Sequence, residues 1–264
     1  MMTLLMVLMV VLAIHSAPLS GAAEGLKFYL VPDFSKITGP VIVGAMNQAF
    51  FTLSVGMGSM AIFGSYIGKE QSLLGESANV IVLDTFVAIV AGLIMFPACY
   101  TYGLEVNAGP SLLFVTLPTI LQDIPMGRLF AIILYLAMIF AGVSSLQNMF
   151  EAVAESLLHK SSKLSRTAVL AILCVLCLGI GIFMEPISKW GPWMDLVSIY
   201  IIPIGATLGA ISWFYVMKKD ELLAAVNTGS KKERGALWYN VGRFVYVPLA
   251  VILCCVALFM HVAF

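Results

Sequence analysis

Apolar residues form long runs along this chain, and short polar stretches separate the runs. The hydrocarbon core of a bilayer is about 30 Å thick, so a helix that crosses it needs about 20 mostly apolar residues. The pattern predicts seven membrane segments, at residues 1–17, 43–66, 80–100, 129–157, 167–184, 194–217 and 238–262. We therefore expect an all-α, polytopic membrane protein in which residues 1–264 form a single transmembrane domain.

The second predicted segment is interrupted by small and polar residues. Residues 47–68 have the sequence NQAFFTLSVGMGSMAIFGSYIG, and Thr52, Ser54, Gly56 and Gly58 lie near its middle. Unwound backbone is tolerated within a membrane only where it is buried in protein or lines a cavity. Such a broken helix can hold an ion and a small substrate. We predict a broken helix near residues 54–58 that forms a binding site; the alternative is a kinked helix that packs closely against a neighbour.

Ionisable side chains within apolar segments are functional candidates by default, because their burial in lipid is costly. Asp84 lies about one turn inside the third segment, and Asp195 lies at the start of the sixth. Asp84 is therefore a functional candidate, or alternatively an interfacial carboxylate that caps the helix start. Asp195 is either a gate residue or a carboxylate favoured by the helix dipole.

The fourth segment contains FAGVSSLQNMF over residues 140–150. Hard cations prefer oxygen ligands, and Ser144 and Ser145 provide hydroxyl groups here. Serine hydroxyls within helices also commonly bond to the backbone of the preceding turn. The residues alone leave both interpretations open.

The loops predict how the chain is oriented. Lys and Arg are more frequent in the loops after the second, fourth and sixth segments, which predicts that these loops are cytoplasmic. The amino terminus of this plasma-membrane protein is then inside and the carboxyl terminus outside. The first segment lacks the basic residues that begin a signal peptide, so we expect a retained span. Residues 103–127 are interpreted as an outer re-entrant or lid segment, and residues 218–235 as a cytoplasmic loop.

Composition narrows the possible functions. Hydrophobic residues make up 61% of the chain and charged residues 11%, with a formal net charge of zero, which argues against a nucleic-acid partner. Cys174 and Cys177 form a C-x-x-C pair, which leaves an intramembrane thiol oxidoreductase as an alternative. Apolar surroundings raise the pKa of a thiol and disfavour reactivity. We find no nucleophilic triad, zinc spacing or phosphate-binding loop, so neither an enzyme nor an organic cofactor is expected.

The stretches QAFFTLSVGMGSMAIFGSY, FAGVSSLQ, AGPSLLFVTLP and WMDL resemble the neurotransmitter:sodium symporter family, especially its bacterial amino-acid transporters. The resemblance covers essentially all 264 residues. It implies a partial inverted-repeat transporter fold in which this chain corresponds to helices five to eleven. The implied function is sodium-coupled symport of an amino acid or similar small amine, with Na⁺ bound and co-transported.

The resemblance also implies roles for individual residues. The implied substrate-binding residues are Phe51, Thr52, Ser54, Met57, Ser145 and Met149; the implied sodium ligands are Thr52, Asp84, Ala141, Ser144 and Ser145; and the implied gate residues are Gln48, Tyr66 and Asp195. Tyr66 belongs to the inner gate in this assignment, and Gln48 and Asp195 to the outer gate.

Two departures from the family pattern carry hypotheses. Family members often have Asn at the position of Asp84, and a carboxylate there places the negative charge that chloride supplies in chloride-dependent relatives. We therefore hypothesise chloride-independent transport. The family's first helices are not present, so we expect a fragment or half of a transporter that requires an amino-terminal half. The alternative is a non-transporting accessory or scaffold subunit of the membrane.

Overall fold

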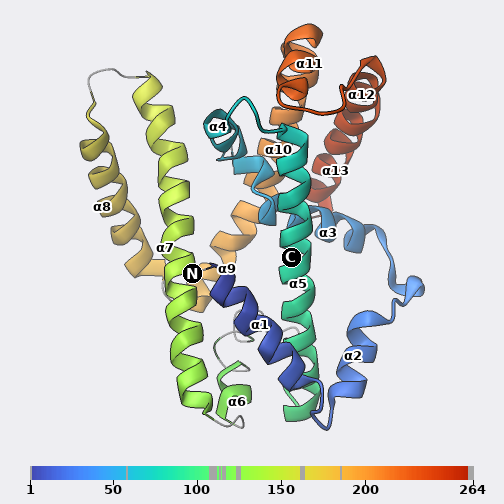
Figure 1. Ribbon diagram of the computed structural model, residues 1–264, viewed down its shortest axis with the longest axis vertical. Coiled ribbons are helices and arrows are strands. Elements are labelled where there is room, and N and C mark those ends of the chain that lie inside the picture. Colours follow the sequence, from blue (N-terminus) through green and yellow to red (C-terminus); the bar gives the residue numbers. More distant parts are fainter. Residues whose placement is uncertain are drawn as a thin grey trace. The chain divides into compact units, whose positions relative to one another are not determined.

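The computed structural model describes residues 2–57, 59–106, 112, 114, 117–122, 126–160, 164–184 and 186–260. The described residues form helices and connecting turns and contain no strand, which confirms the predicted all-α class (Figure 1). The chain divides into two compact units, one of residues 1–34 and 82–147 and the other of residues 35–81 and 148–264.

The first unit is built on the apolar α1. The helices that contribute to this unit are α1 (Met2–Ser16), α2 (Ala22–Leu30), part of α5 (Leu73–Tyr102), α6 (Leu117–Gln122) and part of α7 (Gly127–Lys160). Leu8 and Leu12 lie four residues apart on α1, so they share one face. That face packs into a cluster with Val90 and Ile94 of α5 and Leu134 of α7. Burial of these side chains holds the unit together.

The short helix α2 is held against α5 by aromatic contacts. The rings of Phe28 and Phe96 have centroids 5.4 Å apart, and those of Tyr29 and Phe96 are stacked at 4.7 Å. The Gly21 N–H, just before α2, donates to Thr101 Oγ1 at 3.1 Å. The loop that follows the first predicted segment therefore contains a helix that is fixed to α5.

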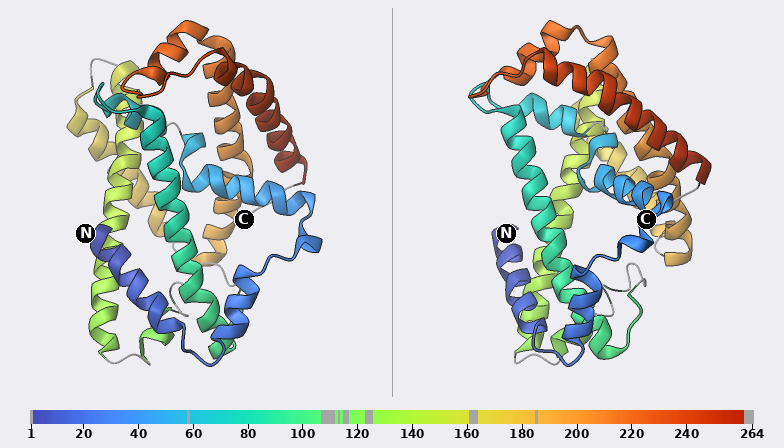
Figure 2. Two further views of the ribbon diagram at one scale, coloured as in Figure 1. Left: turned by 45° about the vertical axis from the view of Figure 1, so that its right-hand side comes forward. Right: turned by 90° about the vertical axis from the view of Figure 1, so that its right-hand side faces the viewer.

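The second unit contains the interrupted segment and the carboxyl-terminal helices. Its elements are α3 (Gly39–Thr52), η2 (Val55–Met57), α4 (Ser59–Tyr66), α8 (Arg166–Met184), α9 (Ile187–Asp195), η4 (Leu196–Ile201), α10 (Ile202–Ile211), η5 (Ser212–Val216), α11 (Lys219–Asn227), α12 (Ala236–Val241), η6 (Gly242–Tyr246) and α13 (Val247–Met260), with the ends of α5, α7 and the short turn η1 (Phe34–Lys36). Figure 2 shows α13 running beside α10, and Thr207 donates to the Ala250 carbonyl at 3.3 Å between them.

Three turns of this unit are π-helical, and proline accounts for two of them. Proline has no N–H for the carbonyl four residues earlier, and its ring crowds that carbonyl. Pro203 follows η4, and Pro248 follows η6. The wider π turn leaves room for the proline ring beside the carbonyl that proline cannot bond. Such turns occur frequently at functional sites.

Five helical stretches of the described residues are long and apolar enough to cross a membrane: Leu73–Tyr102, Gly127–Lys160, Arg166–Met184, Lys189–Val216 and Ala236–Phe259. They match the third to seventh predicted segments. The predicted number of seven membrane segments is not confirmed, because five of the predicted segments form helices long enough to cross a membrane. The first segment forms a helix of 15 residues, about 22 Å long. The second is divided between α3 and α4, so neither half is long enough alone.

The predicted loops contain more structure than their composition suggests. Residues 218–235 include α11, and Asn227 closes the turn after it through Arg234, with Nδ2 donating to the Arg234 carbonyl at 2.9 Å. Within 103–127 the structure describes α6. Residues 107–111, 113, 115–116 and 123–125 of the predicted lid lie outside the described residues, and the lid assignment remains a prediction.

The turn η2 lies directly against α10. A methyl group on Gly56 would overlap the Ile202 carbonyl oxygen, and one on Gly205 would overlap the Gly56 carbonyl oxygen. Gly209, one turn further along α10, has no atom within 4 Å of the position that its methyl group would take. Two glycines therefore allow the backbone of the interruption to contact the backbone of α10.

We predict that Gly205→Ala lowers the free energy of unfolding by about 1–3 kcal/mol, because the added methyl group forces η2 away from α10. Gly209→Ala is the control on the same helix. It should leave the stability unchanged or raise it by up to about 1 kcal/mol through helix propensity. Thermal unfolding of both variants in detergent measures the difference. Equal stabilities would show that the contact between Gly56 and Gly205 is unimportant.

Candidate functional site

The backbone between α3 and α4 leaves the helical path. The last bonds of α3 are made by the N–H groups of Leu53 and Ser54, which donate to the carbonyls of Ala49 at 3.1 Å and Phe51 at 3.0 Å. Ser54 has a φ of +54°, a left-handed conformation that a non-glycine residue rarely adopts. The short turn η2 follows before α4 begins at Ser59. This geometry confirms the predicted helix break near residues 54–58; Gly58 lies outside the described residues.

The substrate residues inferred from the resemblance gather around this break only in part. Phe51 and Thr52 end α3, with Phe51 half-buried and Thr52 exposed, and Ser54 is half-buried at the break itself. Met57 lies in η2. Met149 belongs to the same unit but lies on α7, where it is exposed. The backbone thus brings four of the six residues into one short stretch.

The remaining sodium-site residues belong to the first unit. Asp84 is half-buried on α5, and Ala141, Ser144 and Ser145 lie within one turn of α7. The Ser144 hydroxyl donates to the Ala141 carbonyl at 2.8 Å, which is the local bond that the alternative interpretation anticipates. The sodium-site assignment remains a prediction.

Gate candidates occupy different positions in the second unit. Gln48 is exposed on α3, and Asp195 is exposed at the end of α9, where its carbonyl accepts the Ser198 hydroxyl at 3.5 Å. Tyr66 is the last residue of α4, and its hydroxyl donates to Glu151 Oε1 at 2.9 Å. Of the three candidates, Tyr66 is the one that joins a polar network.

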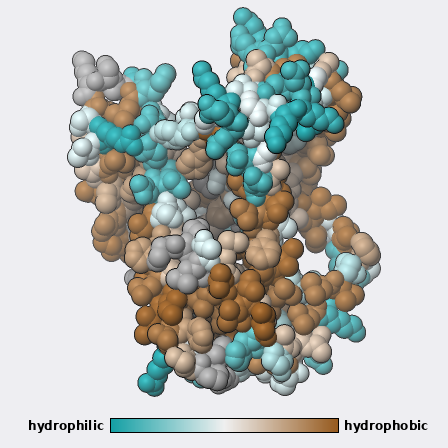
Figure 3. Space-filling model, in the orientation of Figure 1, coloured by the Kyte–Doolittle hydropathy of each residue, from teal (hydrophilic) through white to brown (hydrophobic). Residues whose placement is uncertain are grey.

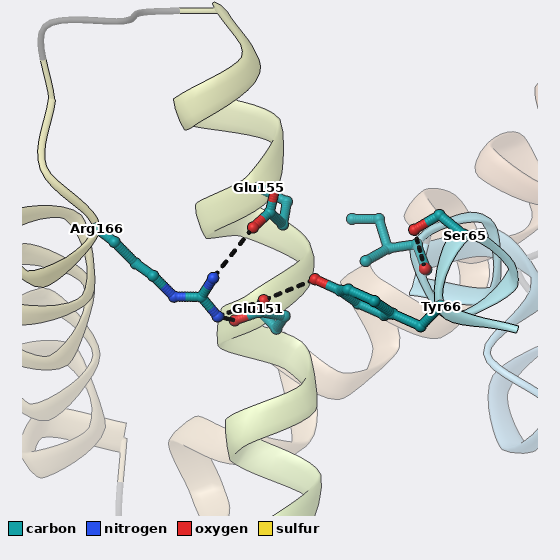
Figure 4. Close-up of polar contacts among 6 residues, drawn as sticks. Ser65, Tyr66, Glu151, Glu155 and Arg166 are labelled. Atoms are coloured by element: carbon teal, nitrogen blue, oxygen red, sulfur yellow. Dashed lines mark hydrogen bonds and ion pairs between the residues drawn. The ribbon is translucent and has the colours of Figure 1, made fainter. Parts of the chain in front are cut away.

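That network links α4, α7 and α8 (Figure 4). Arg166, the first residue of α8, donates through Nη2 to both oxygens of Glu151, at 2.5 and 2.6 Å. Its Nη1 donates to Glu155 at 3.3 Å. One guanidinium nitrogen contacts both oxygens of Glu151 and the other contacts Glu155, so a single cation binds two carboxylates. Tyr66, Glu151 and Arg166 therefore form a polar link that joins the end of α4 and the start of α8 to α7.

Comparisons with known proteins show which family the chain belongs to. The model of the sodium:neurotransmitter symporter family matches residues 1–263. The chain belongs to this family. The bacterial relatives and the solved structure described in the next paragraph agree with this assignment. The family is the one that the sequence stretches resemble.

The symporter-family chain is 36% identical over 96% of its length to the uncharacterised sodium-dependent transporter YhdH of Bacillus subtilis. It is 30% identical over 96% of its length to an uncharacterised sodium-dependent transporter of Haemophilus influenzae. Its fold matches the crystal structure of MhsT in complex with L-phenylalanine with a TM-score of 0.85 and 32% identity, over 97% of this chain. These similarities support the transporter fold.

The symporter-family relatives are longer than this chain. The matches span 59% of the Bacillus subtilis protein, 57% of the Haemophilus influenzae protein and 61% of the MhsT chain. The activity of a whole symporter is therefore not established for this chain by its similarity to them.

Three members of the network, Glu151, Glu155 and Arg166, were not among the sequence candidates. Glu151 and Glu155 lie four residues apart on α7, so they share a face, and Arg166 begins the next helix. Two carboxylates on one face of a mostly apolar segment were the available indication. Their spacing predicts a shared face but not the arginine that binds them, because that contact depends on how α8 returns along α7.

We predict a coupling energy of about 0.5–1 kcal/mol between Arg166 and Glu151, because Arg166 Nη2 contacts both Glu151 oxygens and Glu151 is only 19% exposed. A double-mutant cycle with Arg166→Gln and Glu151→Gln, read by unfolding in detergent, measures it. Added salt should reduce the coupling. The control is the pair Lys218–Glu221, whose side chains are 84% and 63% exposed, and which should give a value near zero. The same coupling in both pairs would contradict the proposed link.

Proposed function

We propose that this chain contributes the carboxyl-terminal helices of a plasma-membrane symporter that couples Na⁺ entry to the uptake of an amino acid or similar small amine. The observation that carries the proposal is the helix break between Thr52 and Ser59. Backbone groups freed from a membrane helix need other partners. Ions and a bound solute supply them in transporters with broken helices. Membership of the symporter family supports the same function.

The substrate proposal is an amino acid with an apolar side chain. MhsT was solved with L-phenylalanine, and two of the proposed pocket residues here, Met57 and Met149, are methionines. Methionine is flexible and apolar, so it adapts to irregular hydrophobic groups. Phe51, Thr52, Ser54 and Ser145 complete the proposed substrate pocket.

The sodium proposal rests on the chemistry of the assigned ligands. Thr52, Asp84, Ala141, Ser144 and Ser145 provide hydroxyl, carboxylate and carbonyl oxygens, which suit a hard cation. Membrane potential can drive entry of such a cation, since one charge moved across 100 mV gains about 2.3 kcal/mol. The relatives' description as sodium-dependent transporters supports this assignment.

The gating proposal is that Tyr66 closes the inner side, and that Gln48 and Asp195 border the outer side. The link from Tyr66 to Glu151 and Arg166 supports the first part, because it ties the end of α4 to α7 and α8. The excess of Lys and Arg in the loops after the second, fourth and sixth predicted segments supports an inward-facing amino terminus and an outward-facing carboxyl terminus.

Uptake of labelled amino acids, including L-phenylalanine, tests the proposal. The chain is expressed alone and together with the amino-terminal helices of the Bacillus subtilis relative, in cells or vesicles with and without an inward sodium gradient. We expect sodium-driven uptake from the combination and little from the chain alone. Robust uptake by the chain alone would refute the need for an amino-terminal half. No uptake by a folded, co-purifying combination would instead favour an accessory or scaffold subunit.

Ser144→Ala should raise the sodium concentration for half-maximal uptake about tenfold, since loss of one ligand costs about 1.4 kcal/mol. Ser156→Ala is a matched control on α7. Both hydroxyls donate to a carbonyl of the preceding turn at 2.8 Å, but only Ser144 is a proposed sodium ligand. If both variants changed the sodium dependence alike, the effect would come from the helix and not from a sodium site.

Asp84→Asn should reduce uptake in chloride-free medium, and added chloride should restore part of it. The reason is that the variant loses the fixed negative charge proposed to stand beside the sodium ion, which a bound chloride can replace. Sodium-driven uptake with and without chloride, in the variant and the unmodified protein, gives the comparison. If the variant transports normally and remains indifferent to chloride, the role assigned to Asp84 is wrong.

A further inference from the structure

The last membrane helix contains a cation that the proposed transport function does not use. Arg243 lies in η6, seven residues after the start of the stretch Ala236–Phe259. At 1.5 Å per residue it is about 10 Å from that start. The 14 residues of α13 that follow are apolar throughout. Arg243 thus stands at the edge of the hydrocarbon-crossing part, where a long cationic side chain can reach the headgroup layer.

The backbone of Arg243 is held in place by a neighbouring helix. In η6 the Val247 N–H bonds to the Gly242 carbonyl, five residues earlier. The same spacing would pair the Arg243 carbonyl with residue 248, a proline without an N–H. The Tyr215 hydroxyl of η5 donates to this carbonyl instead, at 2.9 Å. A π turn that lacks one internal donor thus obtains it from the adjacent π turn.

A second tyrosine makes the return connection. The carbonyl of Phe214 lies at the end of η5, where carbonyls have no partner within their own helix. The Tyr239 hydroxyl donates to it at 3.0 Å. The two hydroxyl bonds run in opposite directions between neighbouring helices, so η5 and η6 are clamped together and Arg243 is fixed with them.

The Arg243 guanidinium lies among aromatic rings and takes part in no ion pair among the described residues. The guanidinium carbon, Cζ, lies 4.7 Å from the centre of the Tyr215 ring and 5.7 Å from the centre of the Phe244 ring. Nη1 donates to the Tyr239 hydroxyl at 3.4 Å, and the buried Nε has no hydrogen-bond partner in the described structure. A cation in a membrane helix normally has an anionic or carbonyl partner, so this guanidinium calls for an anion.

The surroundings indicate where that anion comes from. Lys219 lies 5.7 Å over the same Tyr239 ring, so two cations meet at one tyrosine. Trp213, Tyr215 and Phe244 are 48%, 47% and 66% exposed. Exposed aromatic rings are typical of the boundary between lipid and water. In Figure 3 hydrophilic residues gather over α11, which begins with Lys219.

We propose that Arg243, with Lys219, binds the phosphate group of an anionic phospholipid headgroup at the end of α12–α13. The planar guanidinium fork matches two phosphate oxygens, and the Tyr215 ring holds the fork at the membrane boundary. Lys219 adds a second positive charge on the side of the solvated loop. Such basic sites at the ends of membrane helices attract anionic lipids.

Tryptophan quenching by brominated lipids tests the proposal. The 264-residue chain carries Trp190→Phe and Trp193→Phe, which leaves Trp213 and Trp238 beside the site. It is reconstituted in vesicles in which dibrominated phosphatidylglycerol or dibrominated phosphatidylcholine is present at equal fraction. We expect about 25-fold stronger association of phosphatidylglycerol, given roughly 1 kcal/mol from each of the two cations. Arg243→Gln leaves Lys219 in place and should reduce the ratio to about fivefold.

Controls separate the charge from the fold and the lipid from free phosphate. Arg234→Gln removes a cation from the solvated loop, where the backbone of Arg234 and not its side chain bonds to Asn227, and should keep the ratio. Arg243→Lys retains the positive charge and should keep at least half of the preference for phosphatidylglycerol over phosphatidylcholine. Equal quenching by both lipids in the unmodified site, or a ratio as low in Arg243→Lys as in Arg243→Gln, overturns the proposal. Loss of the preference in millimolar inorganic phosphate would assign the site to a soluble anion instead.

Discussion

The requirement that every backbone polar group find a partner governs this structure. In lipid an unpaired N–H or carbonyl costs several kcal/mol, so membrane segments are helical unless something else supplies the missing bonds. In the described part of the second unit, membrane helices depart from regular α-helix at the break between α3 and α4 and at the π turns η4, η5 and η6. Each departure brings the backbone close to another part of the second unit.

The break depends on α10 for its place. Gly56 and Gly205 have no side chains, so the two backbones meet directly, and Ser54 takes the left-handed conformation that turns the chain away from α3. The freed groups of this stretch are the basis of the proposed substrate and sodium sites. At η5 and η6 tyrosine hydroxyls donate to the Phe214 and Arg243 carbonyls, and this fixes Arg243 against η5.

Charged residues in the helices follow a common pattern. Glu151 is engaged by Arg166 and by the Tyr66 hydroxyl, which links the end of α4 and the start of α8 to α7. Arg243 has aromatic rings and a tyrosine hydroxyl in place of a carboxylate. A buried charge is tolerable only with such partners. The first group ties helices of the chain to one another, and the second leaves positive charge directed toward something outside the chain.

Apolar run length alone determined the all-α membrane class and the positions of five spans, because crossing the hydrocarbon sets a minimum length for any helix. The cluster of Thr52, Ser54 and Gly56 was sufficient to predict the break, since small and polar residues in mid-span are locally unfavourable to a membrane helix. Tertiary structure alone decided what meets the break, which arginine binds Glu151 and which hydroxyls complete the π turns. Those contacts join residues far apart in the chain, and local periodicity carries no information about which distant partner a helix face will meet.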